Sequence, residues 1–176
     1  MDGRFPPTRP QANSMTEPSH GVFEDRPELF VGTIENCAVV IWRATPTVDT
    51  AKLAARHFSK FEGEAGRGFA LVAIITANCA PVGPDVRQAF DEAMRAHREA
   101  ALGMAAVIEV QGVLGGLTRA MARTMSIVTR SPYPTNTFAT VKSASEWMPY
   151  ILSQRGAPEL SPSVISDFVE NHRHPA

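Results

Sequence analysis

The sequence predicts an α/β domain built on a mostly parallel, mixed sheet of about five strands, covered by helices. The first observation is a set of apolar runs of strand length, at 37–42, 69–76 and 104–110, of which the last is interrupted by Glu109. Strands buried on both faces of a sheet have this composition. The second observation is that amphipathic segments separate the runs, which indicates helices joining parallel strands through right-handed crossovers.

A hairpin is expected at the start of the sheet. A short, weak strand at Leu29–Ile34 precedes the apolar run Cys37–Trp42, and two residues, Glu35 and Asn36, lie between them. This pairing leaves the first strand antiparallel at one edge.

Residues 1–26 contain four prolines and show no apolar period, so we expect this segment to be disordered.

Capping residues mark where the helices begin. Thr47 is a good N-cap for the first helix, and Pro84 stands at the favoured first position of the second. Ser143 and Glu146 have the spacing of a capping box. Ser161, followed by a proline, starts a final short helix. Its apolar face consists of Val164, Ile165, Phe168 and Val169, and a short preceding linker leads us to expect that it docks on its own domain.

Glycines and prolines delimit the elements between these helices. The first helix closes at 63–68, and Gly103 is expected to end the second helix just before a strand at 104–110. Glycines at 112, 115 and 116 lead into a third helix, which the prolines at 132 and 134 break. The last strand is predicted at 137–141.

Charge and composition exclude several classes of function. The 17 basic and 18 acidic residues give a net charge of −1, whereas general nucleic-acid or membrane-surface binders need a basic excess. The longest apolar run, 69–77, is far shorter than the roughly 20 residues that cross a bilayer. The two cysteines, Cys37 and Cys79, belong to no CxxC pair and are predicted to be free thiols of a cytoplasmic protein.

Four stretches carry a resemblance to a known family. They are 69–76, 84–95 (Pro-Asp-Val-Arg-Gln-Ala-Phe-Asp-Glu-Ala-Met-Arg), 104–112, and 138–147 (Phe-Ala-Thr-Val-Lys-Ser-Ala-Ser-Glu-Trp). With the order of elements over about residues 28–152, they resemble the STAS/SpoIIAA-like family of bacterial-type signalling regulators, including STAS/SEC14-type domains. The resemblance implies a STAS/SpoIIAA-like domain at 27–155, followed by a linker, a short helix and a polar tail at 156–176. It also implies binding to a protein partner, and a homodimer is possible.

The loop that carries the family's regulatory serine differs here. Phosphorylatable members have an Asp-Ser-Ser-Gly type motif between the third strand and the second helix. Residues 76–83 of this chain read Thr-Ala-Asn-Cys-Ala-Pro-Val-Gly, without a serine or an acidic residue. We therefore expect no phosphorylation switch in this loop, where Thr76 is the only hydroxyl.

A candidate binding site is predicted at the carboxyl edge of the sheet, where open α/β sheets bind ligands. The candidate residues are Arg43, Thr45, Asn78, Cys79, Gln111 and Gly112. The competing interpretation is that these are ordinary loop and turn residues. The glycines near 112 match neither dinucleotide- nor nucleotide-binding motifs, and tight turning explains them better.

Two basic stripes are candidate docking faces for an acidic partner, although most such stripes are simply solvated. Lys52, Arg56 and Lys60 form the first stripe, and Arg119 and Arg123 form the second.

Three other polar positions are given structural interpretations. His97 is expected to be a hydrogen-bonded core histidine. Glu109 is expected to face outward near a strand end. The pair His172 and His174 is expected in a solvated tail, because two ligands do not make a structural zinc site.

The sequence therefore favours a non-enzymatic regulatory module that binds a protein partner. It points to no catalytic residue, metal ligand or cofactor. The alternative is a small-molecule or lipid-headgroup binder, or a minor enzyme, that uses the carboxyl edge of the sheet. A well-packed edge would favour the first function, and a deep pocket with convergent polar groups would favour the second.

Overall fold

A computed structural model describes residues 19–64, 68–109, 133–154, 156–157 and 160–175 of the chain. It confirms the α/β class. The strands, in chain order, are β1 His20–Asp25, β2 Leu29–Ile34, β3 Cys37–Trp42, β4 Phe69–Ile75, β5 Ala101–Ile108 and β6 Thr135–Phe138. The helices are α1 Val48–Glu64, α2 Pro84–Ala96, α4 Val141–Ser153 and α5 Pro162–Asn171. The predicted third helix lies outside the described residues.

The sheet is mixed, with strand order β1-β2-β3-β4-β5-β6. β1, β2 and β3 are antiparallel neighbours, and β3 to β6 are parallel. The predicted hairpin is confirmed, since β2 pairs with β3 from Leu29↔Trp42 to Ile34↔Cys37. Its turn places Glu35 at a positive φ of 48°. The Nδ2 of Asn36 donates to the carbonyl of Gly68 at 2.8 Å and ties the turn to the start of β4.

One strand more than expected occupies the edge of the sheet. β1 lies within the segment predicted to be disordered, so that prediction is wrong for residues 20–25, and β2 is an inner strand. The pattern of β1 is weak because Val22 and Phe23 are its only large apolar residues. Contacts remote in sequence hold it: Phe23 stacks on His57 of α1 at 5.8 Å and packs near Phe61.

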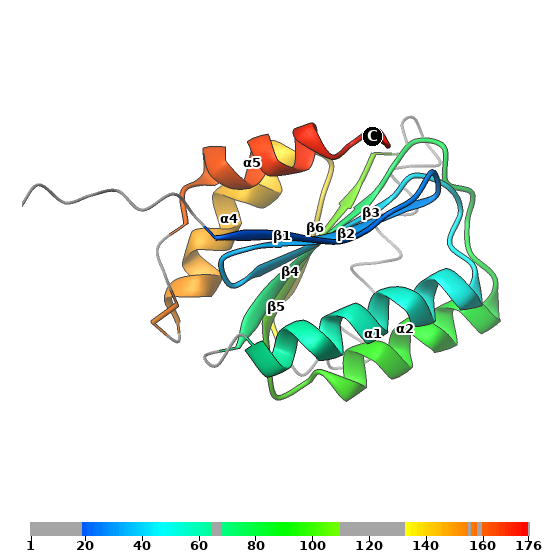
Figure 1. Ribbon diagram of the computed structural model, residues 1–176, viewed down its shortest axis with the longest axis horizontal. Coiled ribbons are helices and arrows are strands. Elements are labelled where there is room, and N and C mark those ends of the chain that lie inside the picture. The colour runs from blue at the N-terminus through cyan, green and yellow to red at the C-terminus, as the bar shows by residue number, and fades with distance from the viewer. Residues whose placement is uncertain (1–18, 65–67, 110–132, 155, 158–159, 176) are drawn as a thin grey trace, which may run out of the picture.

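Helices cover both faces of the sheet, with α4 and α5 on one side and α1 and α2 on the other (Figure 1). Successive side chains of β3 point to opposite faces. Cys37, Val39 and Ile41 therefore join the core beneath α4 and α5. Ala38, Val40 and Trp42 join the second core beneath α1. This two-sided burial explains why the inner strands read as continuous apolar runs.

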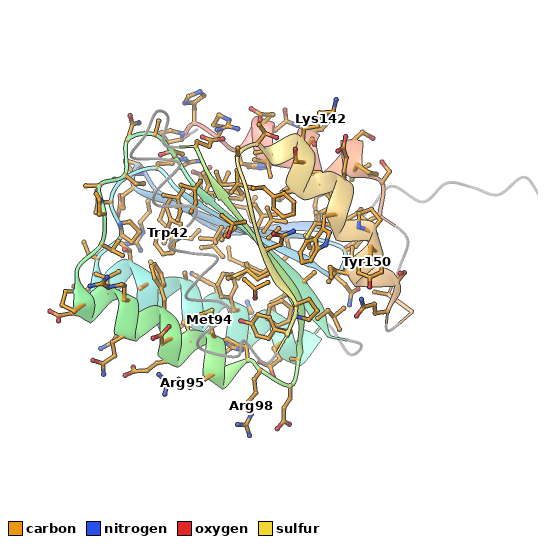
Figure 2. All side chains as sticks on the ribbon, turned by 180° about the vertical axis from the view of Figure 1, so that it is seen from behind. Trp42, Met94, Arg95, Arg98, Lys142 and Tyr150 are labelled. Atoms are coloured by element: carbon orange, nitrogen blue, oxygen red, sulfur yellow. The ribbon has the colours of Figure 1, made fainter. Side chains whose placement is uncertain are left out.

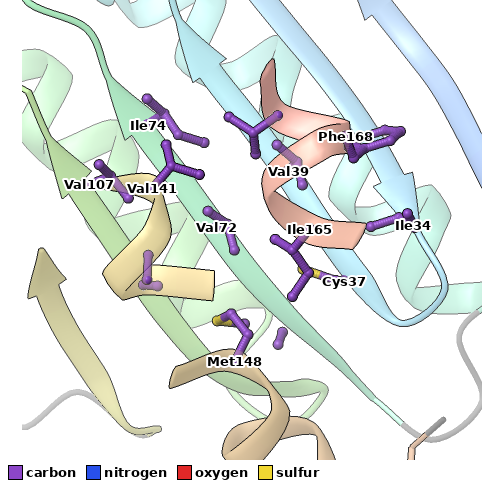
Figure 3. Packing of buried hydrophobic residues seen from close by; sticks show 14 of the residues in the cluster. Ile34, Cys37, Val39, Val72, Ile74, Val107, Val141, Met148, Ile165 and Phe168 are labelled. Atoms are coloured by element: carbon purple, nitrogen blue, oxygen red, sulfur yellow. The ribbon is translucent and has the colours of Figure 1, made fainter. Parts of the chain in front are cut away.

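The C-terminal helix α5 docks on its own domain, as expected. Ser161 caps it by accepting a hydrogen bond from the amide of Val164 at 3.4 Å. Ile165 and Val169 are fully buried, and Phe168 is 6% exposed. Figure 3 shows Ile165 and Phe168 over the β3 residues Cys37 and Val39 and over Ile34 of β2.

Two predicted element boundaries are wrong. Gly103 does not end α2, because it lies inside β5. A Cβ at this position would come within 2.8 Å of the Ile151 side chain, so the glycine allows α4 to approach the sheet closely. The predicted capping box is also absent. Thr140 caps α4 by accepting from the amide of Ser143 at 3.2 Å, and Val141 belongs to the helix, not to the last strand.

Among the described helices, none is both long and apolar enough to cross a membrane.

Candidate functional site

The registers of the parallel strands bring three polar residues side by side at the carboxyl edge. Trp42 pairs with Ile75, and Ile75 pairs with Ile108. The residues that follow these three, Arg43, Thr76 and Glu109, come next in the same row. Their backbone bonds continue the ladder, because the amide of Thr76 donates to Trp42 at 3.2 Å and that of Glu109 donates to Ile75 at 3.0 Å. A cation, a hydroxyl and a carboxylate therefore share one edge.

Arg43 is buried at this edge, with 8% of the residue exposed. Its Nη1 contacts the Oδ1 of Asp25 in β1 at 2.6 Å and donates to the carbonyl of Arg26 at 2.5 Å. Its Nε and Nη2 donate to three successive carbonyls of the C-terminal tail, residues 172–174, at distances from 2.5 to 3.1 Å. The guanidinium thus joins the first strand to the end of the chain, and all three of its nitrogens are engaged.

The tail also neutralises Glu109. The Nη1 of Arg173 donates to both carboxylate oxygens of Glu109 at 2.8 Å. The same guanidinium binds Glu170 through Nε and Nη2, each at 2.7 Å. Hydrogen bonding by Arg173 lowers the pKa of Glu170, and the pKa of Arg173 is raised by the same bond. We call Asp25, Arg43, Glu109, Glu170 and the tail residues 172–174 the carboxyl-edge clasp.

Hydrogen bonds from hydroxyl and thiol groups connect the end of β3 to the end of β4 and the loop after it. The carbonyl of Trp42 accepts from the Thr76 amide, from the Thr76 hydroxyl at 2.9 Å and from the Cys79 thiol at 3.2 Å. The hydroxyl of Thr45 accepts from the amide of Ala80 at 2.8 Å. These bonds hold the loop after β4 against the end of β3.

Both thiols are buried and free, as expected. Burial raises the pKa of Cys79, and it raises the pKa of Cys37 to about 12. Each side chain therefore stays a neutral thiol near neutral pH, whereas the thiolate is the nucleophilic form.

The candidate residues differ in what the structure shows of them. Arg43, Thr45 and Cys79 lie at the carboxyl edge and bond to the chain's own backbone. Asn78 lies in the same loop and is exposed. The other candidates, Gln111, Gly112, Arg119 and Arg123, lie outside the described residues. Every buried side-chain nitrogen and oxygen in the described part of the chain has a hydrogen-bond partner.

The role of the C-terminal tail was not expected from the sequence. The prediction of a solvated tail is wrong for His172, whose ring stacks on Phe30 at a centroid distance of 4.5 Å. The Nδ1–H of His172 donates to the carbonyl of Phe168 at 2.8 Å. The signal available in the sequence was the pair Arg43 and Glu109, since charges that directly follow buried strands need partners. Glu109 lies just after its strand, but Arg173 binds it, so it does not simply face solvent.

His97 is a core histidine, as predicted. It is 6% exposed, and its Nδ1 lies 2.5 Å from the Oε2 of Glu62. The rings of Phe58 and Phe69 surround it at 6.4 and 6.0 Å. This contact ties the end of α1 to the end of α2.

The basic residues of α1 have a different environment. Lys52, Arg56 and Lys60 are exposed on its outer face, and we call them the α1 stripe. None of them forms an ion pair with any residue that the structure describes. The Nζ of Lys60 lies 5.7 Å from the centroid of the Phe23 ring, which orients this one cation.

No family model and no curated protein matches the chain. Within the described residues, no group of three or more histidine, cysteine or acidic side chains is placed to hold a metal ion.

Proposed function

We propose that this chain is a non-enzymatic, cytoplasmic regulatory module that binds a protein partner through its outer surface. The STAS/SpoIIAA-like regulators that it resembles work by binding proteins. The α/β order with an edge hairpin agrees with that resemblance. The two buried, free thiols fit a reducing compartment.

The observation that carries the proposal is the engagement of Arg43. In open α/β sheets, ligands bind outside the carboxyl ends of the strands. A ligand with an acidic group would need donors there, and the buried guanidinium of Arg43 is a strong donor. Here it bonds to Asp25 and to carbonyls of the tail. A ligand would have to displace residues 172–174 to reach it.

The neighbouring groups support the same conclusion. Glu109 is paired with Arg173, and the hydroxyl of Thr76 and the thiol of Cys79 both donate to Trp42. Displacing the bonds of Thr76 and Cys79 would leave buried polar groups unpaired, at about 1–3 kcal/mol for each group. Freeing Glu109 would break its ion pair with Arg173. Binding a protein on the outer surface requires no such loss.

The proposal is tested by purifying the tagged full-length chain from its native cells under mild conditions. Proteins and small molecules that accompany it are then identified by mass spectrometry. We expect a protein partner, or a second copy of the chain, in a stoichiometric complex that reforms from purified components.

A stoichiometric small molecule would contradict the proposal. Native mass spectrometry would reveal it as an added mass that disappears on denaturation. Loss of that mass in the Arg43→Met variant would place the ligand at the carboxyl edge and support the alternative function.

A further inference from the structure

We propose that the α1 stripe is a docking surface for an acidic surface on the protein partner. This inference rests on the proposed function and adds the chemistry of the partner. Lys52, Arg56 and Lys60 follow one another at intervals of four residues and are all exposed. Residues four apart lie on one side of a helix, about 6 Å apart along its axis. The stripe therefore presents three cations in a row.

No carboxylate that the structure describes forms an ion pair with this row of cations. Two described carboxylates of α1 and β1 have other partners: Glu62 contacts His97, and Glu24 binds Arg26 at 2.8 Å. The hydrogen bond from Arg26 lowers the pKa of Glu24, so that carboxylate stays ionised and paired. Asp49, at the start of the helix, forms no ion pair with Lys52 among the described side chains.

The outer face of α2 shows what an ordinary solvated helix looks like in the same molecule. The two arginines of α2, Arg87 and Arg95, and Arg98 in the following turn are outnumbered by carboxylates at positions 85, 91, 92 and 99. Arg98 pairs with Glu99 at 3.6 Å, and Gln88 donates to Glu92 at 2.9 Å. Arg95 of α2 and Arg98 of the following turn point away from the sheet (Figure 2). Carboxylates therefore alternate with the arginines here, whereas the exposed positions of α1 between 49 and 60 hold three cations and one carboxylate.

An acidic protein surface fits the stripe better than a membrane or a nucleic acid. The exposed positions of α1 between 49 and 60 are Asp49, Lys52, Arg56, Ser59 and Lys60. None is apolar, whereas helices that lie in a membrane interface insert large apolar residues. The chain as a whole carries a net charge of −1, which opposes wrapping by a phosphate backbone. Carboxylates at every fourth residue of a partner helix match the spacing of the stripe.

The test compares three probes on the full-length chain. The first is a fluorescent helical peptide of about 16 residues with glutamate at every fourth position. The others are a DNA duplex of similar length and vesicles containing phosphatidylserine. Two charge-reversal variants change the net charge equally: K52E/R56E/K60E alters the stripe, and R87E/R95E/R98E is the control on α2 and the turn after it. Thermal melting confirms that both variants fold.

We expect the wild-type chain to bind the acidic peptide in a salt-sensitive manner. K52E/R56E/K60E should weaken this binding by about tenfold or more, whereas the α2 control should retain it. Equal binding by the two variants would overturn the inference. Tighter binding of the duplex or the vesicles than of the peptide would overturn it as well.

A second readout separates this inference from the proposed function. If a purified partner binds wild type and K52E/R56E/K60E equally, the docking surface is wrong and the proposed function stands. If the stripe variant alone loses the partner, both are supported. If no protein partner is found with wild type, the proposed function fails, whatever the peptide shows.

Discussion

The clasp at the carboxyl edge and the α1 stripe both contain arginine, but in opposite environments. In the clasp, Arg43 is 8% exposed and bonds to one carboxylate and four carbonyls. In the stripe, Arg56 is exposed and has no ion pair among the described residues. A polar residue at a favoured ligand position can therefore be structural. A residue on a plain helix face can instead be the one available to a partner.

A substitution in α5, the helix that leads into the clasp, should have the largest effect on the free energy of unfolding. Phe168 is buried against Phe30 and His172, at centroid distances of 5.9 and 4.6 Å. Phe168→Ala should lower the free energy of unfolding by about 3–5 kcal/mol, because it leaves a cavity beneath α5. Asp167→Ala, at an exposed position of the same helix, is the matched control and should change it by less than about 0.5 kcal/mol. Equal urea midpoints for the two variants would show that α5 does not support the domain.

Removing the buried guanidinium should have the next largest effect. Arg43→Met keeps most of the side-chain volume but leaves Asp25 and the carbonyls of the tail unpaired. We expect a loss of about 3 kcal/mol in the free energy of unfolding. Arg56→Met makes the same chemical change on the α1 stripe and should cost little. Similar unfolding curves for the two variants would contradict the claim that Arg43 stabilises the fold and Arg56 does not.

The ion pair between Arg173 and Glu170 should make a small contribution to the free energy of unfolding, and this contribution should depend on pH. Hydrogen bonding by Arg173 lowers the pKa of Glu170 in the folded chain. A lowered folded-state pKa adds stability at pH values above the unfolded-state pKa, and this stability is lost as the pH falls. Because the Glu170 side chain is 54% exposed, we expect at most about 0.5 kcal/mol.

Glu170→Gln should therefore reduce the stability near neutral pH slightly and flatten the acid limb of the pH–stability profile. A profile that matches wild type from neutral to acidic pH would mean that this pair contributes nothing to the clasp.

The smallest effect on stability is expected at the stripe itself. Lys52→Ala and Arg56→Ala remove exposed charges without a described ion pair, so melting temperatures should stay close to that of wild type. Lys60→Ala should cost slightly more, because the Lys60 ammonium lies over the ring of Phe23. Destabilisation by Arg56→Ala on the scale of Arg43→Met would assign the stripe a structural role.

Local patterns predicted most of the fold. The apolar runs gave β3 and β4, the residues Glu35 and Asn36 gave the hairpin turn, and Ser161 gave the start of α5. Thr140 was missed as the cap of α4 because it and Ser143 both carry hydroxyl groups three residues apart, and only the backbone conformation distinguishes them. β1 was missed because its stabilising partners lie in β2 and α1, not in its own sequence.

The sequence predicted that Arg43 lies at the carboxyl edge of the sheet, but it did not predict the bonds that Arg43 makes there. The position of Arg43 after a buried strand indicated the carboxyl edge. Its partners in the tail are about 130 residues away along the chain, and carbonyl groups leave no mark on a sequence pattern. The pairing of Glu109 with Arg173 spans 64 residues and was hidden for the same reason.

The exchange rate of arginine Nε protons, measured by NMR, tests the contrast between clasp and stripe most directly. The Nε–H of Arg43 donates to the carbonyl of Arg173 at 3.1 Å, inside the clasp. It should exchange slowly with solvent in the intact chain and rapidly after deletion of residues 172–176. The Nε–H of Arg56 should exchange rapidly in both proteins. Rapid exchange at Arg43 in the intact chain, at the rate seen for Arg56, would contradict a closed carboxyl edge.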